Sequence, residues 1–202
     1  MASRYFIKFN FNPWKQTKAG DCTIRAVSGA TGLSYKEVCR RYGVACKNGY
    51  GLMRKTGINL EDTKEKFDEY FDVVEDFYDD FGFVPDEMKD TFDAKLVKAL
   101  DQHSASEYAS GDTLEDFCDM YDGQGRFLIS LVPNPEAKDE AAKRDGHIVY
   151  ANLSSNAKRP GFVDTWDSSE MLVDAFMRIT KTEPKDSPLH WKYDKANHRF
   201  IV

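Results

Sequence analysis

Cys22 lies in the stretch KAGDCTIRAVSGATG, directly after Gly-Asp and at the start of a segment with helical character. A cysteine acts as a nucleophile through its thiolate, which is favoured at a helix N-terminus and beside a protonated histidine. Cys22 meets the first of these two conditions. We therefore predict Cys22 as a nucleophile, and the alternative from its residue type alone is a buried structural thiol.

A cysteine nucleophile needs a base that removes the thiol proton. The chain has four histidines: His103, His147, His190 and His198. His147 follows Gly146 and opens an apolar, strand-like segment, so a rigid element would hold its ring at the end of a sheet. The other three fall in a polar loop or in the last segment of the chain. We therefore predict His147 as the base, with a structural strand-end histidine as the alternative.

The base needs a third group that fixes the tautomer and the orientation of its ring. The segment GFVDTWDSS, which follows the strand-like segment of His147, contains Asp164 and Asp167. Alternation along a strand places Asp164 and Trp166 on one side and Asp167 on the other. We predict Asp164 as the orienting acid. Asp167 is expected to begin a turn or to cap a following helix.

These residues resemble the catalytic set of papain-like cysteine peptidases. Gln16 lies six residues before Cys22, and His147 and Asp164 follow the cysteine by 125 and 142 residues. The family places its histidine and its asparagine about 130–150 residues after the cysteine. The segment DTW at 164–166 is similar to the family's Asn-Ser-Trp motif, with Asp in place of Asn. The resemblance covers about three quarters of the chain.

The resemblance implies a papain-like fold and nucleophilic acyl transfer through a thioester. Cys22 would attack a carbonyl carbon after His147 takes its proton, and the side chain of Gln16 would hold the oxyanion together with the backbone N–H of Cys22. A tryptophan at 166 would cover the contact between the histidine and the acid. The residues expected to contact the substrate are Asp21, Gly146 and Trp166.

The flanks of the cysteine differ from the family pattern, because Ala-Gly-Asp-Cys-Thr replaces Cys-Gly-Ser-Cys-Trp. The segments GDCTIRA, ATGLSY, GHIVYA and DTWDSS together resemble small papain-like proteins of bacteriophage genomes. We therefore expect a distant, cytosolic branch of the superfamily. For Asp21 a second interpretation stays open, in which its carboxylate caps the helix that begins at Cys22.

The order of the predicted elements indicates an α+β fold, with N-terminal helices packed on a C-terminal antiparallel sheet in one domain over 1–202. A strand-like segment opens the chain, capping patterns mark three helices, and apolar alternation marks the later strands. The predicted strands cover 4–11, 126–132, 147–153 and 161–166, the predicted helices cover 22–31, 35–41 and 113–121, and a closing hairpin turns at 195–197.

The segment 61–93 differs from the rest in composition. It holds fourteen acidic residues against three lysines, a local charge of −11, which leaves about +5 for the remainder. Apolar and aromatic residues recur four positions apart, as in Phe67 with Phe71 and Tyr70 with Val74, and this spacing predicts an acidic helical insertion. This segment is interpreted either as solvated helices that pack an aromatic face onto the core, or as a docking site for a basic host protein. The simplest partner for its acids is the set of basic residues Arg25, Lys36, Arg40, Arg41, Lys47, Arg54 and Lys55.

Composition excludes several other classes of function. The net charge of −6 argues against nucleic acid as the main partner, and no apolar run approaches the roughly 18 residues of a membrane span. The first residues lack the pattern of an export signal, so we expect the cytoplasm, or the host cytoplasm if the source is a phage. Four cysteines do not make a disulfide framework, and their spacing predicts no metal site; we expect no cofactor.

Three functions are compatible with these residues. The first is a cysteine peptidase or isopeptidase that acts on a protein or peptide substrate. The second is an amidase on peptidoglycan peptides, which uses the same chemistry. The third is a non-catalytic module on a papain-like scaffold, in which the segment 61–93 binds a basic partner. Thiol reactivity discriminates the first two from the third, because a catalytic Cys22 should alkylate at pH values where ordinary thiols are protonated.

Overall fold

The computed structural model describes residues 2–12, 20–44, 46–47, 50–51, 59–77, 111–182, 192–194 and 199–201. The helices in these ranges are α1 (Cys22–Thr31), α2 (Tyr35–Arg41), α3 (Leu60–Lys66) and α5 (Leu114–Met120), with the 3-10 turn η2 (Glu140–Lys143). The strands are β1 (Phe6–Lys8), β2 (Cys46–Lys47), β3 (Tyr50–Gly51), β4 (Glu75–Asp76), β5 (Arg126–Val132), β6 (His147–Asn152), β7 (Gly161–Asp164), β8 (Leu172–Arg178), β9 (Lys192–Asp194) and β10 (Arg199–Ile201). The predicted α+β class is confirmed.

The central sheet has six strands in the order β1-β7-β6-β5-β8-β4. All of its pairs are antiparallel except β1 with β7, which run parallel. The strands β5 to β8 pair antiparallel, as expected for the C-terminal sheet, but the expectation did not include the parallel strand β1. The N-terminal strand β1 lies at the edge of the sheet and runs in the same direction as β7. Local sequence patterns do not reveal such a pairing, because the two segments are far apart in the chain. The strand pairing expected for the closing hairpin is confirmed, since β9 and β10 pair antiparallel, while its turn at 195–197 lies outside the described residues.

Capping residues set the bounds of the helices, as the sequence predicts. α1 ends where Gly32 adopts a left-handed conformation with φ 78° and donates its N–H to the carbonyl of Ser28. The Ser34 side chain accepts the N–H of Glu37 at the start of α2. Thr113 and Asp116 form a reciprocal capping box at the start of α5. The bounds of α1 and α2 agree with the prediction, and α5 ends one residue before the predicted end at Tyr121.

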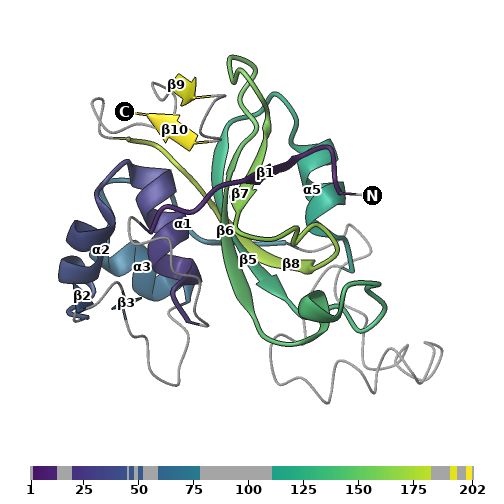
Figure 1. Cartoon of the computed structure of the whole chain (residues 1–202), viewed down its shortest axis with the longest axis horizontal. Helices are drawn as coiled ribbons and strands as arrows, with labels where there is room; N and C mark the ends of the chain where they lie inside the picture. The colour runs from purple at the N-terminus through teal and green to yellow at the C-terminus, as the bar shows by residue number, and fades with distance from the viewer. Residues whose placement is uncertain are drawn as a thin grey trace.

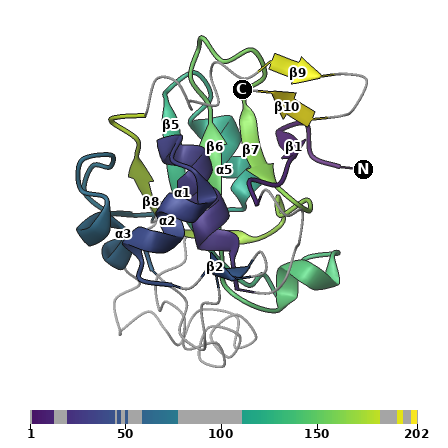
Figure 2. The same cartoon turned by 60° about the vertical axis from the view of Figure 1, so that its left-hand side comes forward.

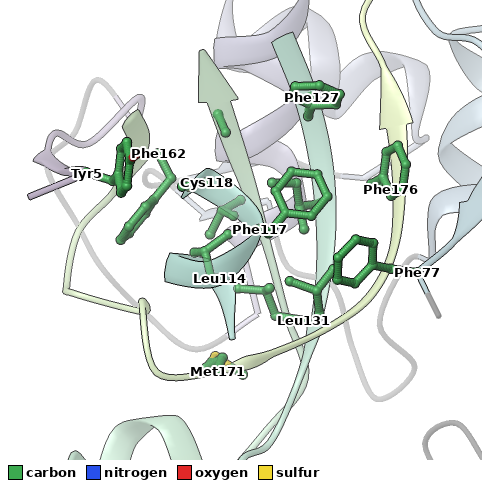
Figure 3. Close-up of a cluster of buried hydrophobic side chains, with 14 of the residues drawn as sticks. Tyr5, Phe77, Leu114, Phe117, Cys118, Phe127, Leu131, Phe162, Met171 and Phe176 are labelled. Carbon is green, nitrogen blue, oxygen red and sulfur yellow. The ribbon is translucent and has the colours of Figure 1, made fainter. Parts of the chain in front are cut away.

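Each face of the sheet carries a hydrophobic core, because the strand side chains alternate between the two faces. In β5, Leu128 packs with α1, α2 and α3, while Phe127 and Ile129 pack with α5. Figure 1 shows the three N-terminal helices on one side of the sheet and α5 on the other. On the α5 side Phe117 places its ring against Phe127 and Phe176, at centroid distances of 5.4 and 5.2 Å (Figure 3).

The described part of the acidic segment, 61–77, is not one continuous helix. α3 ends at Lys66, so the aromatic pairs four residues apart do not lie on a helix face. Phe67, Tyr70 and Phe71 are nevertheless buried in the core of the α1 side. The chain reaches that burial through a turn and then an edge strand, because β4 pairs with β8 and satisfies backbone groups there. Residues 78–93 lie outside the described residues.

Among the described residues, ion pairs are seen for three of the basic residues predicted as partners of the acidic segment, Arg25, Arg40 and Arg41. Arg41 does contact it, with Nη1 2.5 Å from a carboxylate oxygen of Glu69. Arg40 instead pairs with Glu37 of its own helix. Arg25 pairs with acids outside the segment. The predicted pairing of the two charged regions is therefore wrong for Arg25 and Arg40. Arg25 binds buried acids at the start of α1 and the end of β7, and Arg40 binds a neighbour in its own helix.

Gly161 holds β1 against β7 at close range. A Cβ atom at this position would lie 2.1 Å from the carbonyl oxygen of Tyr5, which accepts the N–H of Phe162. We expect Gly161→Ala to lower the free energy of unfolding by about 1–3 kcal/mol, measured by urea denaturation, because backbone has to move. Gly146→Ala is the matched control: its Cβ would meet nothing nearer than 3.5 Å, so we expect a change within about 0.5 kcal/mol. Equal effects of the two substitutions would contradict this account of the β1 edge.

Candidate active site

Three elements meet at the site: the N-terminus of α1, the start of β6 and the end of β7. β6 and β7 are antiparallel, with Tyr150 opposite Val163, so the first residue of one strand and the last of the other lie at the same end of the sheet. α1 packs against β6 (Figure 2). The first residue of the helix, Cys22, is thereby brought to His147 and Asp164.

His147 is bonded to Asp164. The ring Nε2 lies 2.6 Å from Oδ2 of the carboxylate. The His147 side chain is 10% exposed and that of Asp164 is 2% exposed, so water screens their interaction little. Because Nε2 faces the acid, Nδ1 is the ring nitrogen left for a second partner.

The second partner of His147 is the thiol of Cys22. Burial on its own would raise the pKa of this thiol, but the hydrogen bond and the charge of His147 act in the opposite direction. The backbone N–H of Ile148 and the charge of Arg25 act in the same direction as His147, and together they hold the pKa of Cys22 below its ordinary value of 9.0. A thiolate at the first residue of a ten-residue helix also gains from the helix dipole.

The imidazole of His147 responds in the complementary direction. Burial alone would lower its pKa, but the charge of Asp164, the hydrogen bond to that acid and the contact with Cys22 raise the pKa from 6.5 to about 9. A raised histidine pKa beside a lowered cysteine pKa means that one proton moves from sulfur to nitrogen. Both shifts act in the direction of a thiolate–imidazolium pair.

Both oxygens of Asp164 are satisfied although its side chain is buried. Oδ1 accepts the N–H of Thr165 at 2.6 Å and lies 3.2 Å from Nη1 of Arg25. Oδ2 accepts the hydroxyl of Ser168 at 3.0 Å in addition to its bond with His147. Burial raises the pKa of this carboxyl, but the charge and hydrogen bond of His147 and the charge of Arg25 lower it below the ordinary value. Asp164 is thus held as the anion that the histidine needs.

Asp21 precedes α1, but its side chain does not cap the helix. Its carboxylate instead lies 2.8 Å from Nε of Arg25 and accepts hydrogen bonds from Tyr35 Oη at 3.1 Å and Asn12 Nδ2 at 3.2 Å. The expectation of a capping role is therefore wrong. The reason is the buried guanidinium one turn later, which binds the carboxylate more strongly than backbone N–H groups do. At 3% exposure, Asp21 faces the interior.

The remaining predicted residues are placed as follows. The indole of Trp166 lies beside the His147 ring, with centroids 5.5 Å apart at 43°, and packs partly on the core of the α5 side. Gly146 is exposed and directly precedes β6. Gln16 lies outside the described residues, as do the histidines at 103, 190 and 198.

Asp167 follows β7 but caps no helix. Its carboxylate accepts the N–H of Ser3 at 2.8 Å and that of Ser169 at 3.2 Å. The segment after it forms a turn and then the strand β8, which the sequence analysis did not predict. The expectation of a helix after Asp167 is therefore wrong, because the turn at 168–171 leads into a strand that pairs with β5.

Sequence reasoning also missed the roles of Arg25 and Ser168. A signal for Arg25 was present: it lies four residues after Asp21 and within one turn of Cys22, in a helix whose other neighbours are apolar or small. An arginine in such a helix needs an acidic partner nearby. Ser168 offers no comparable signal, because serine is common in turns.

The described ranges show no other arrangement of this kind. No group of three or more His, Cys, Asp or Glu residues there could hold a metal ion. The thiols of Cys39 and Cys118 are buried, and burial raises the pKa of Cys118. Among the same residues, no helix has the length and apolar character that crossing a membrane requires.

No family model, curated protein or solved structure matches the chain. Function is therefore inferred from the geometry of Cys22, His147 and Asp164, together with the resemblance of their sequence motifs.

The thiol–imidazole pair links the stability of the protein to pH through two groups. The pKa of His147 is raised from 6.5 to about 9, so its contribution to stability is complete below pH 6.5 and is lost as the pH rises through 9. The pKa of Cys22 is lowered from 9.0, so its contribution is complete above pH 9.0 and is lost as the pH falls through the folded value. Where the two pH ranges overlap, their slopes oppose each other.

We therefore expect this pair to add little pH dependence to the free energy of unfolding in the upper part of the interval between pH 6.5 and 9. Cys22→Ala removes one of the two opposing contributions. Because Asp164 still raises the pKa of His147, the variant should lose stability relative to the wild type as the pH rises through this interval. Urea unfolding of both proteins at several pH values measures the difference. A difference that stays constant with pH would contradict the ion pair.

Proposed function

We propose that the chain is a cysteine hydrolase with a papain-like fold, in which Cys22, His147 and Asp164 form the catalytic triad. The observation that carries this proposal is that one buried histidine bonds both the acid and a thiol whose pKa is lowered. A structural cysteine or a structural strand-end histidine needs neither contact. The neighbouring indole of Trp166 supports the same assignment, because it covers one side of the His147 ring.

The proposed reaction is acyl transfer in two steps. The Cys22 thiolate attacks the carbonyl carbon of an amide, isopeptide or thioester, and the His147 imidazolium gives its proton to the leaving group. A thioester on Cys22 remains. Water then attacks this thioester while His147 takes a proton from the water. The carboxylic acid and the Cys22 thiolate separate, which restores the thiolate–imidazolium pair.

The tetrahedral intermediates carry an oxyanion that needs donors. The backbone N–H of Cys22 is placed for this at the N-terminus of α1, and the resemblance assigns the second donor to the side chain of Gln16. Loss of one such donor costs about 3–4 kcal/mol of transition-state stabilisation in comparable sites.

The proposed substrates are proteins or peptides in the cytoplasm. A peptidase or isopeptidase fits the site, and a peptidoglycan amidase would use the same steps. Of the proposed substrate-contacting residues, Gly146 and Trp166 border His147, whereas the burial of Asp21 assigns it to the support of the site.

A second candidate function is a non-catalytic binding module. The observation that favours it is the exposed acidic face of α3 and the turn that follows, which could attract a basic partner. The exposed acids are Glu61, Asp62, Glu65, Asp68, Glu69 and Asp72. The pair of Cys22 and His147 has no role in such a module, which makes reactivity at Cys22 the decisive property.

The test is a substrate and probe screen with the full chain. Libraries of peptide and isopeptide substrates are assayed for product, and a peptide vinyl sulfone is used to trap the nucleophile, with the adduct mapped by mass spectrometry. We expect turnover of at least one substrate class and one adduct, on Cys22. Cys22→Ser should lose both, whereas the matched control Cys39→Ser should keep both. The absence of turnover and of a selective adduct would favour the binding module.

A further inference from the structure

Arg25 is a buried charge within one turn of the nucleophile. Its side chain is 10% exposed, and burial of a guanidinium is costly unless acids and hydrogen bonds compensate it. Two carboxylates do so: Nε lies 2.8 Å from Oδ1 of Asp21, and Nη1 lies 3.2 Å from Oδ1 of Asp164. Nη1 is also 3.4 Å from the hydroxyl of Thr165. One planar group thus spans from the start of α1 to the end of β7.

Asp21 fixes the other end of this span. Its Oδ1 binds Arg25, and its Oδ2 accepts hydrogen bonds from the hydroxyl of Tyr35 in α2 and the side-chain amide of Asn12. The guanidinium is therefore oriented by a carboxylate that two further elements hold in place. Since a planar guanidinium has a fixed donor geometry, its Nη1 can then reach only a limited set of positions.

The two oxygens of Asp164 divide their partners between the two sides of the site. Oδ1 faces Arg25 and Oδ2 faces His147. We propose that Arg25 is a positioning residue, which with Asp21 ties the acid of the triad to the helix that presents Cys22 and supplies the positive charge that this buried acid requires. This inference rests on the proposed function, because it assigns Arg25 a part in that same site.

The charges around Arg25 determine how the site should respond to substitution. The groups that act on Arg25 directly are Asp21, Cys22 and Asp164. Tyr35 of α2 bonds Asp21, and His147 of β6 bonds Asp164 and Cys22. Loss of the Arg25 charge disfavours a thiolate at Cys22, whereas loss of the Asp21 charge favours it. Substitution of Arg25 and substitution of Asp21 both break the ion pair between them. If that ion pair only stabilised the fold, the two substitutions would not shift the Cys22 thiolate equilibrium in opposite directions.

The experiment measures the rate of iodoacetamide labelling of Cys22 against pH, by mass spectrometry, in the wild type and in single variants. The midpoint of this curve is the pH at which half of the maximal labelling rate is reached. For Arg25→Met we expect the midpoint to rise by about 1 pH unit, which slows labelling at pH 6 by roughly tenfold. For Asp21→Asn we expect a shift in the opposite direction. Arg25→Lys keeps the charge and should bring the midpoint back toward the wild-type value.

The outcomes separate this inference from the proposed function. If the wild-type midpoint is lowered but Arg25→Met and Asp21→Asn leave it in place, or move it the same way, the positioning role is overturned and the triad stands. If wild-type Cys22 labels as an ordinary thiol, both are overturned. Thermal melting of each variant shows whether it is folded. Should Arg25→Met not fold, Arg25→Gln, which is neutral but still donates hydrogen bonds, takes its place with the same expected direction.

Discussion

Replacing His147 with alanine should slow alkylation of Cys22 at pH 6 by about 100-fold. Burial alone would raise the pKa of the wild-type thiol, and the largest opposing effects are the hydrogen bond and the positive charge of His147. Without the imidazole, the pKa of the thiol should return to about 8.5 or above, where less than about 1% is thiolate at pH 6.

The rate for the His147→Ala variant is measured by iodoacetamide labelling followed by peptide mapping, with Cys39 and Cys118 as internal references. Both are buried, and we expect their labelling not to change. Alanine substitutions at His103, His190 and His198 serve as matched controls that remove the same residue type. If one of these variants slowed Cys22 and His147→Ala did not, the base would be misassigned.

Replacing Asp164 with alanine should lower the free energy of unfolding by about 3–5 kcal/mol. The change leaves Arg25 buried beside an empty position and removes the partner of a protonated His147, and uncompensated buried charges are among the costliest defects in a folded protein. Asp164→Asn keeps the shape and one acceptor oxygen, so a smaller loss is expected. Urea denaturation near neutral pH measures both variants.

A double-mutant cycle tests the cause of this loss. In Asp164→Ala, Arg25 keeps Asp21 but loses its second carboxylate. When Arg25→Met is added, no guanidinium faces the emptied position, so the double variant should lose less than the two single variants add up to. A coupling energy near zero would show that the two side chains do not stabilise each other. Ser168→Ala, which removes one neutral donor to the same carboxylate, should cost only about 1 kcal/mol.

Local signals in the sequence were sufficient for most helix and strand bounds. The predicted span of α1 was right because Gly32 ends it with a left-handed residue, and that of α5 was right within one residue because Thr113 and Asp116 form a capping box. The span of β5 was right because an apolar run lies between turn residues. The same signals placed Cys22 at a helix start and His147 at a strand start, which is what brings the two residues to one end of the sheet.

Long-range contacts are what the sequence could not supply. The parallel pairing of β1 with β7 joins segments about 155 residues apart, and nothing local specifies the direction of such a pair. Phe67 and Phe71 are spaced for a helix face, but a core can bury them equally well through a turn and an edge strand. Aspartate is a residue type that often caps helices, but the side chain of Asp21 binds Arg25 instead, and only the three-dimensional structure shows this contact.

The presence of Asp rather than Asn at position 164 accounts for much of the surrounding structure. An asparagine would orient the histidine without adding a charge, whereas a buried aspartate needs a cation besides the imidazolium. Arg25 is that cation, and Asp21 in turn binds Arg25. The aspartate at position 164 and the charged residues Asp21 and Arg25 are therefore parts of one arrangement.

The most direct test of the central claim is a titration of the Cys22 thiolate itself. The ultraviolet absorbance of the thiolate is followed against pH as the difference between the wild type and Cys22→Ala, so that the other cysteines and the tyrosines cancel. We predict that Cys22 forms its thiolate at lower pH than an ordinary thiol, with His147 protonated until about pH 9. A single transition near the pKa of an ordinary thiol, about 8.5, would contradict it and leave Cys22 without a catalytic role.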